Sequence, residues 1–175
     1  MRNYESANGS LPPAAVLGQD GKPLLSWRVL LLPYIEEKEL YEESKLDEPW
    51  DSLHNLKLVE RMPPIYGPYP GCPAPPHRTF FQVVRGPGTA FERPGQGLSN
   101  LKGRASNAFL VVEAEEPVFW TQPDDLEYDP DGPLPRLGGI MRDGTFRVAM
   151  ANGKVRTLSF ADEDTIRAGI TGKAP

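Results

Sequence analysis

The chain has 175 residues and a formal net charge of −5, which is long enough for one domain with its own core. Its 17 glycines and 20 prolines total 37 of 175 residues, or 21%. That share exceeds the roughly 12% of average proteins but stays below the roughly 25–30% typical of disorder. We therefore expect a single folded, loop-rich domain over residues 1–175. One cysteine excludes an intrachain disulfide.

The acidic residues gather in one stretch. Residues 36–48 hold seven carboxylates and two lysines, and seven minus two equals the whole net charge. The remainder lacks the basic stripe that nucleic-acid binding needs, so we expect no nucleic-acid partner. No apolar run approaches the roughly 20 residues that span a bilayer, and the first residues do not form a signal peptide. We expect no membrane span, signal peptide or anchor in this chain.

The first part of the chain predicts loop and then short helices. Residues 3–19 combine an Asn-Gly turn signal with a proline pair, which favours loop. Ser26 is a good N-cap for a helix that begins at Trp27. Pro33 interrupts that helix, because proline lacks an N–H donor, and can open a second one over residues 34–43.

The second and third helices have narrow apolar faces. In the helix over residues 34–43 we expect Ile35, Leu40 and Tyr41 to point inward, with the glutamates in solvent. Asp51 or Ser52 can cap a third helix over residues 53–61. Three of its apolar residues share one face at helical spacing: Leu53, Leu56 and Val59.

The second half predicts antiparallel strands between long loops. Residues 79–84 and 107–113 are rich in β-branched and aromatic residues, as strands are. Residues 145–150 and 154–158 flank Asn152-Gly153, and we expect these two residues at the centre of a tight hairpin turn with positive φ at both. Asp162 should cap a last helix that ends near Gly169. Helices followed by antiparallel strands define an α+β fold.

Taken together, several motifs resemble one family. The stretches that carry the resemblance are residues 21–28, 46–55, 111–114, 120–126 and 152–156. They are similar to the globular part of a large bacterial family of prepilin-like proteins, abundant in planctomycetes and known only as a domain of unknown function. Relatives begin with a prepilin-type methylation motif and a long apolar helix, which this chain lacks. It also departs at Leu53, where proline is usual, and at residues 104–107, where Asp-Gly-Thr-Ser-Asn is usual.

The resemblance implies a pseudopilin-like fold in which helices pack on an antiparallel sheet. It implies an extracytoplasmic or cell-envelope location and no known catalysis. It also implies protein partners at the envelope, with self-association as one form. If an apolar helix once packed on the domain, we expect an apolar face to remain around Tyr4, Leu11 and the neighbours of Trp27.

A late acidic loop is the main candidate metal site. Four aspartates lie within eight residues: Asp124, Asp125, Asp129 and Asp131. Calcium prefers several carboxylate and carbonyl oxygens from one flexible loop, and some pseudopilins hold calcium in a late loop. However, Pro130 interrupts the aspartates and the glutamate spacing of an EF-hand is missing. An ordinary acidic loop with Asx turns is the alternative.

Other chemistry has weaker support. Cys72, His54 and His77 lack the paired spacing of a zinc site and the context of a cysteine nucleophile. The carboxylates around Trp50 could form a glycosidase pair, but helix caps beside a buried tryptophan are the simpler reading. The glycine-rich loops lack the Lys-Ser/Thr ending of phosphate loops. Trp27, Trp50 and Trp120 are expected to be core or loop anchors.

The leading hypothesis is a non-enzymatic, pseudopilin-like head domain that acts through protein contacts at the cell envelope. The alternative is a small module that binds a glycan or solute with the loops 67–78, 86–103 and 121–139. A concave cluster of these loops would favour the module, and a flat or convex one would favour the head domain. An enzyme is a third option.

Overall fold

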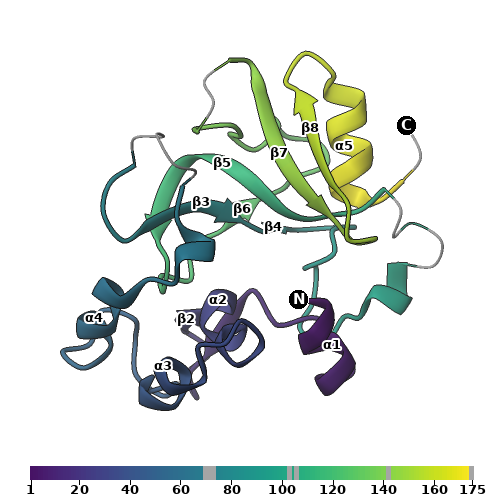
Figure 1. The fold of residues 1–175 in the computed structure, drawn as a ribbon. Coiled ribbons are helices and arrows are strands. Elements are labelled where there is room, and N and C mark those ends of the chain that lie inside the picture. The colour runs from purple at the N-terminus through teal and green to yellow at the C-terminus, as the bar shows by residue number, and fades with distance from the viewer. Residues whose placement is uncertain (69–73, 102–103, 105–106, 141–142, 174–175) are drawn as a thin grey trace.

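A computed structural model describes residues 1–68, 74–101, 104, 107–140 and 143–173 (Figure 1). The helical elements are α1 (Arg2–Asn8), α2 (Trp27–Leu30), η1 (Leu32–Tyr34), α3 (Lys38–Glu43), α4 (Asn55–Leu58), η2 (Val59–Arg61), η3 (Pro64–Tyr66), η4 (Leu98–Leu101) and α5 (Glu163–Thr171). The strands are β1 (Ala15–Leu17), β2 (Pro23–Ser26), β3 (Arg78–Gln82), β4 (Val84–Arg85), β5 (Phe109–Phe119), β6 (Leu126–Glu127), β7 (Thr145–Met150) and β8 (Val155–Ser159).

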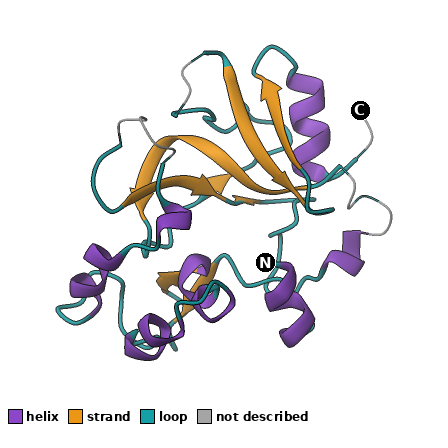
Figure 2. Ribbon diagram, viewed as in Figure 1, coloured by secondary structure: helices purple, strands orange, loops and turns teal. Residues whose placement is uncertain are grey.

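A four-stranded antiparallel sheet organises the molecule. Its strand order is β3-β5-β7-β8, and the short helices gather below it while α5 lies beside its upper end (Figure 2). Two smaller pairs accompany it, an antiparallel β1-β2 ribbon and a parallel β4-β6 pair. Helices followed by antiparallel strands confirm the predicted α+β class. None of the helices in the described ranges is both long and apolar enough to cross a membrane.

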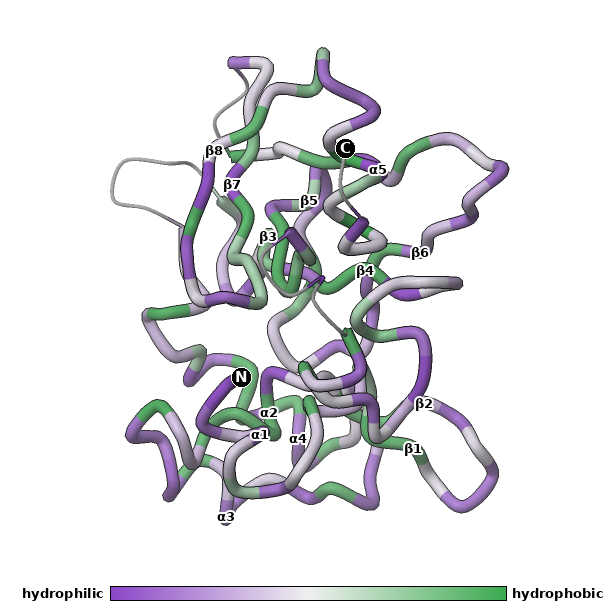
Figure 3. Tube along the Cα trace, turned by 90° about the vertical axis from the view of Figure 1, so that its right-hand side faces the viewer, coloured by the Kyte–Doolittle hydropathy of each residue, from purple (hydrophilic) through white to green (hydrophobic). Residues whose placement is uncertain are grey.

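The strand β7 separates two environments. Phe146, Val148 and Met150 are buried and pack against Ile166 and Ile170 of α5. The residues between them are only half-buried and face the other side of the sheet, as the period of two in a strand requires. Thr145 and Arg147 on this other side are polar, whereas Ala149 is apolar; Figure 3 shows β7 coloured by hydropathy.

A separate core holds the N-terminal helices together. Trp120 is fully buried there, and its Nε1 donates to the Val59 carbonyl at 2.9 Å. Tyr66 stacks on Trp120 with ring centroids 5.9 Å apart. The predicted anchoring role of the tryptophans is confirmed for Trp27 and Trp120, which expose 2% and 0% of their surface, and Trp50 is half-buried.

Two expectations about the N-terminal half were wrong. Residues 2–8 form the helix α1, which ends at Gly9 with φ of 77°, where a loop was expected. The third helix is shorter than expected, and two of the three residues predicted to share its apolar face are not buried, since Leu53 and Leu56 expose 88% and 47% of their surface. Val59, the third residue, is buried as expected, and Leu58 is buried beside it because the chain turns from α4 into the 3-10 helix η2.

The acidic helix is split. Its expected range contains the end of η1 and the whole of α3, and Glu36 interrupts them with φ of 66°. The expected inward residues are confirmed, since Leu40 is buried and Ile35 and Tyr41 are half-buried. The outer glutamates of α3 lie in solvent.

The hairpin between β7 and β8 forms, but its turn differs from the expectation. Gly153 donates to the Met150 carbonyl, and Met150 donates to the Lys154 carbonyl, so three residues form the loop. Only Gly153 has positive φ, at 87°. This is a type I turn followed by a G1 bulge, in which glycine closes the turn and Asn152 keeps ordinary dihedrals.

The last helix extends past its predicted end. Asp162 accepts a hydrogen bond from the Thr165 N–H at 3.1 Å and caps α5 as expected. The helix continues through Gly169 and ends at Gly172, where φ is 67°. Gly169 is needed for packing, because a Cβ atom there would lie 2.0 Å from the Phe109 ring.

Candidate functional site

An apolar groove of about 470 Å³ lies between the main sheet and the N-terminal helical turns. Val111 of β5 and Ala149 of β7 are floor residues, and Val155 at the start of β8 borders them. Trp27 of α2 and Ile65 of η3 belong to the opposite wall. The groove therefore collects residues from segments far apart in the sequence.

Strand alternation creates the floor. Val111 pairs with Ala149, and Ala149 pairs with Val155, so their side chains share one face of the sheet. This is the face opposite α5, where neighbouring strand residues are half-buried rather than enclosed. Val155 ends the row with 68% of its surface exposed. An apolar sheet face thus continues outward to the β8 edge.

The helical wall is fixed by aromatic packing. Ser26 caps α2 through a hydrogen bond from the Arg28 N–H, which places Trp27 in the first turn. Trp27 meets Tyr66 edge-to-face with ring centroids 6.3 Å apart, and the Tyr66 hydroxyl donates to the Arg28 carbonyl at 2.8 Å. Ile65, next to Tyr66, exposes 61% of its surface at the groove.

A buried ion pair lies behind this wall. Arg28 Nη2 and Asp125 Oδ1 are 3.2 Å apart, and their side chains are 0% and 1% exposed. The same Oδ1 accepts the Trp27 Nε1–H at 3.1 Å and the Val83 N–H at 2.9 Å. Arg28 also donates to the Phe81 carbonyl. The pair therefore ties α2 to the β3–β4 segment.

Burial and charge act against each other in this pair. Burial raises the pKa of Asp125, while Arg28 and the N–H donors lower it. Burial likewise lowers the pKa of Arg28, and Asp125 raises it. We assign the ionised pair, because Oδ1 accepts three N–H donors and such hydrogen bonds favour a carboxylate. Enclosed and fully hydrogen-bonded, the pair positions Trp27 and has no route to a substrate.

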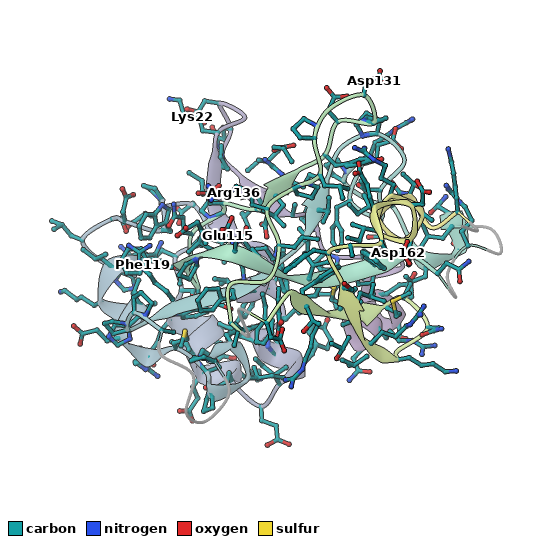
Figure 4. All side chains as sticks on the ribbon, turned by 90° about the horizontal axis from the view of Figure 1, so that it is seen from above. Lys22, Glu115, Phe119, Asp131, Arg136 and Asp162 are labelled. Carbon is teal, nitrogen blue, oxygen red and sulfur yellow. The ribbon has the colours of Figure 1, made fainter. Side chains whose placement is uncertain are left out.

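The four aspartates proposed for calcium do not form one ligand set. Asp125 forms the buried ion pair with Arg28, whereas Asp124, Asp129 and Asp131 are exposed. Figure 4 shows Asp131 at the outer end of its loop. Asp129 accepts the Asp131 N–H at 3.0 Å, which is the Asx turn of the alternative reading. No three His, Cys, Asp or Glu side chains among the described residues are grouped to hold a metal ion.

The guanidinium of Arg167 already binds the carbonyls of this loop. Arg167 of α5 donates to the Gly132 carbonyl at 2.9 Å and to the Pro130 carbonyl at 3.4 Å. Calcium would need such carbonyl oxygens as ligands. The guanidinium therefore competes with an ion for the loop and repels it.

The remaining sequence candidates lie apart. Cys72 falls outside the described residues. His54 Nε2 lies 2.7 Å from the Glu43 carbonyl, and His77 lies immediately before β3. Trp50 packs on Phe119, with ring centroids 5.3 Å apart. Nearby, Glu48 pairs with Lys45 at 2.7 Å, while Asp47 and Asp51 are exposed.

Loop 121–139 meets both of the other candidate ligand loops, at two separate places. The parallel pairing of Val84 with Leu126 and of Arg85 with Glu127 joins the beginnings of loops 86–103 and 121–139. A cavity of about 330 Å³ lies between loop 86–103 and the segment 11–15, with Arg85 and Glu127 at its border. In the described part of loop 67–78, Pro75 lines a different cavity together with Leu137, Gly138 and Gly139 of loop 121–139.

Sequence reasoning located the groove only in part. It expected an apolar face around Trp27, which lines the groove, but also at Leu11, which is buried in the core with 2% exposure. It missed Ile65 and Val155. The signal that could have found Val155 is the alternation of side chains along a strand. Val155 and Thr157 are two residues apart in β8, so Val155 is an apolar residue on the outer face of the sheet.

The fold and the groove define an α+β domain with an apolar surface between a sheet and a helical wall. Residues 1–124 match the family model SBP_bac_10, described as a protein of unknown function (DUF1559). This match covers more than half of the 175 residues, and the chain belongs to that family. Neither a curated protein nor a solved structure matches the chain.

Proposed function

We propose that this chain is a pseudopilin-like head domain that acts through protein contacts at the cell envelope, without catalysis. The envelope location and the prepilin-like character rest on the motif resemblance. Membership of the DUF1559 family is compatible with that resemblance. The observation that carries the contact function is the apolar groove. Contiguous exposed apolar surface is rare on soluble monomers and marks interaction sites.

The composition of the groove supports binding. Ile65 and Val155 stand at its borders with 61% and 68% exposure, so water covers apolar surface that a partner would bury. Burial yields about 25 cal/mol per Å² of apolar surface. The ion pair behind Trp27 keeps one wall rigid, which lowers the entropic cost of docking.

Site-specific photo-crosslinking in the native cells tests this proposal. A photoreactive residue at Val155 or Ile65 should give a discrete adduct in the envelope fraction. The same residue at Leu53, an 88% exposed leucine outside the groove lining, is the matched control and should give none. Ala149→Trp, which fills the groove from its floor, should abolish the adduct. Equal labelling at all three positions, or none at Val155 and Ile65, contradicts the proposal.

The glycan- or solute-binding module is the second candidate, favoured by the cavity of about 330 Å³ beside loop 86–103. Its size falls within the range of small-ligand pockets. A ligand there should raise the melting temperature of the wild-type domain, and Ala14→Trp should remove the shift because the half-buried Ala14 lines this cavity. Ala149→Trp in the groove is the control and should leave the shift intact.

A further inference from the structure

The strand β8 forms an exposed edge of the main sheet. The strand order β3-β5-β7-β8 places it last, and Figure 3 shows it outside β7. Four of its five residues are exposed, and Leu158 is half-buried. An exposed edge strand presents N–H and C=O groups with which another strand can pair. We call this outer side of the strand the β8 edge.

The hydrogen bonds between β8 and β7 show which backbone groups of β8 face outward. Met150 N–H donates to the Lys154 carbonyl at 2.8 Å, and Phe160 N–H donates at 3.1 Å to the carbonyl of the residue before β7. Because backbone groups alternate in direction along an antiparallel strand, the even-numbered residues of β8 bond to β7. The N–H and C=O groups of Val155 and Thr157 therefore point away from the sheet.

Side chains at the β8 edge alternate between the two faces of the sheet. Val155 is paired with Ala149, so Val155 and Thr157 lie on the face opposite α5. Lys154, which precedes the strand, and Arg156 lie on the α5 face. A strand added at this edge would place its own residues alternately beside the first pair and beside the two cations.

The two cations favour an acidic partner over a second copy of this chain. Lys154 and Arg156 are exposed, and neither forms an ion pair within the described residues. Two copies of β8 paired edge to edge would bring four such cations together on one face, and like charges on neighbouring strands repel. A segment with carboxylates on that face would be attracted instead.

We propose that the β8 edge binds an extended segment of a partner protein in which carboxylate side chains alternate with apolar ones. The backbone of the segment pairs with Val155 and Thr157, and its apolar side chains lie on their face of the sheet. Its carboxylates lie beside Lys154 and Arg156. The inference rests on the proposed contact function, and it adds a backbone-pairing surface and the chemistry of the partner.

Three short synthetic peptides test the inference. Each alternates valine with a charged residue, and N-methylation of every second residue leaves one free backbone edge, so that peptide copies cannot stack into larger sheets. The first carries glutamates and the second lysines. The third carries glutamates and is N-methylated at every residue, which removes all of its backbone donors. Binding to the whole chain is measured by fluorescence anisotropy at low salt.

The glutamate peptide should bind roughly tenfold more tightly than the lysine peptide, since each of a few exposed charge pairs contributes several-fold at most. This preference should shrink as salt rises. The fully methylated peptide should not bind, because it cannot donate to the β8 carbonyls. Hydrogen exchange then locates the complex: the glutamate peptide should slow exchange of the Val155 and Thr157 amides, whereas the Arg156 amide, which already faces β7, should change little.

Matched variants separate the backbone from the charges. Thr157→Pro removes an outward N–H without removing a bond to β7, so it should abolish binding of the glutamate peptide. Lys154→Glu combined with Arg156→Glu should reverse the charge preference. Lys22→Glu combined with Lys57→Glu changes the net charge equally at exposed lysines outside β8 and should leave the preference intact. If Thr157→Pro does not fold, the fully methylated peptide still tests the backbone pairing.

Four results overturn the inference: equal affinity for the glutamate and lysine peptides, preference for lysines, undiminished binding of the fully methylated peptide, or no binding of any peptide. Slowed exchange confined to amides outside β8 would do the same. Adducts at Ile65, on the opposite wall of the groove, would in those cases still support the contact function through a different surface.

Discussion

Arg28 Nη2 lies 3.2 Å from Asp125 Oδ1, across 97 residues of sequence, and neither side chain exposes more than 1% of its surface. Removing one member of such a pair leaves a buried charge without its counter-ion. We expect Arg28→Met to lower the free energy of unfolding by about 3–5 kcal/mol. Urea denaturation monitored by tryptophan fluorescence measures this change.

The double variant Arg28→Met/Asp125→Leu distinguishes a lost charge partner from lost packing. It removes both charges and should recover part of the stability, because a buried pair is often replaceable by apolar residues. Recovery should be incomplete, since Trp27 Nε1 and Val83 N–H lose their acceptor. Lys22→Met breaks an exposed pair and is the control, with an expected change within about 0.5 kcal/mol. A similarly small effect of Arg28→Met would contradict the assigned role.

At Gly169, side-chain packing and helix propensity have opposite effects on stability. Replacing a glycine inside a helix by alanine ordinarily stabilises by about 1 kcal/mol. Here the new Cβ would lie 2.0 Å from Phe109, so Gly169→Ala should destabilise by about 1–3 kcal/mol. Adding Phe109→Leu should make room and reduce the penalty attributable to Gly169→Ala. A stabilised single variant would show that α5 does not pack closely on β5.

Asp162 gives a pH dependence. Hydrogen bonds from Thr165 lower the pKa of this capping carboxylate below its usual 3.8. A depressed pKa means that the ionised cap stabilises the fold above pH 3.8, and that this contribution is lost as the pH falls through the lower, folded-state value. Asparagine caps helices about as well but does not titrate there. The melting-temperature advantage of wild type over Asp162→Asn should therefore shrink on acidification. A constant difference between neutral and acidic pH would be the contrary result.

The acidic loop should not respond to calcium. With Asp125 paired to Arg28 and Arg167 bonded to the loop carbonyls, we expect the same melting temperature in millimolar calcium and in chelator. A site filled at a hundred times its dissociation constant would add about 2.7 kcal/mol to the free energy of unfolding. That would raise the melting temperature by several degrees and restore the calcium hypothesis. If calcium did raise the melting temperature, Asp129→Asn should remove that rise.

The sequence predicted the parts of the fold that local chemistry determines. Ser26 and Asp162 are helix caps as expected, and the hairpin forms around Asn152-Gly153. The predicted turn type was wrong, because the observed turn with its G1 bulge needs one residue with positive φ, whereas the expected turn needs two. The exposed Leu53 shows a different difficulty, because apolar spacing alone cannot tell which of two helical faces meets the core.

The groove and the ion pair depend on contacts that sequence spacing does not contain. Asp125 belongs to an acidic cluster in the sequence, and only the approach of Arg28 from the N-terminal half gives it a structural role. Val155 and Ile65 are 90 residues apart and meet only when β8 and η3 flank the same sheet face. Each is an unremarkable apolar residue in its own segment. Pairwise contact across the fold is the missing information.

The contact between residues 28 and 125 also bears on where this chain can be divided. The family match ends at residue 124, one residue before the partner of Arg28. A fragment ending there would keep a buried guanidinium with no counter-ion and would lack β7, so the central strand β5 would become an open edge. The stretch that matches the family model is therefore shorter than the set of segments that this pair and the main sheet hold together. Expression, truncation and domain-fusion designs need the chain through α5.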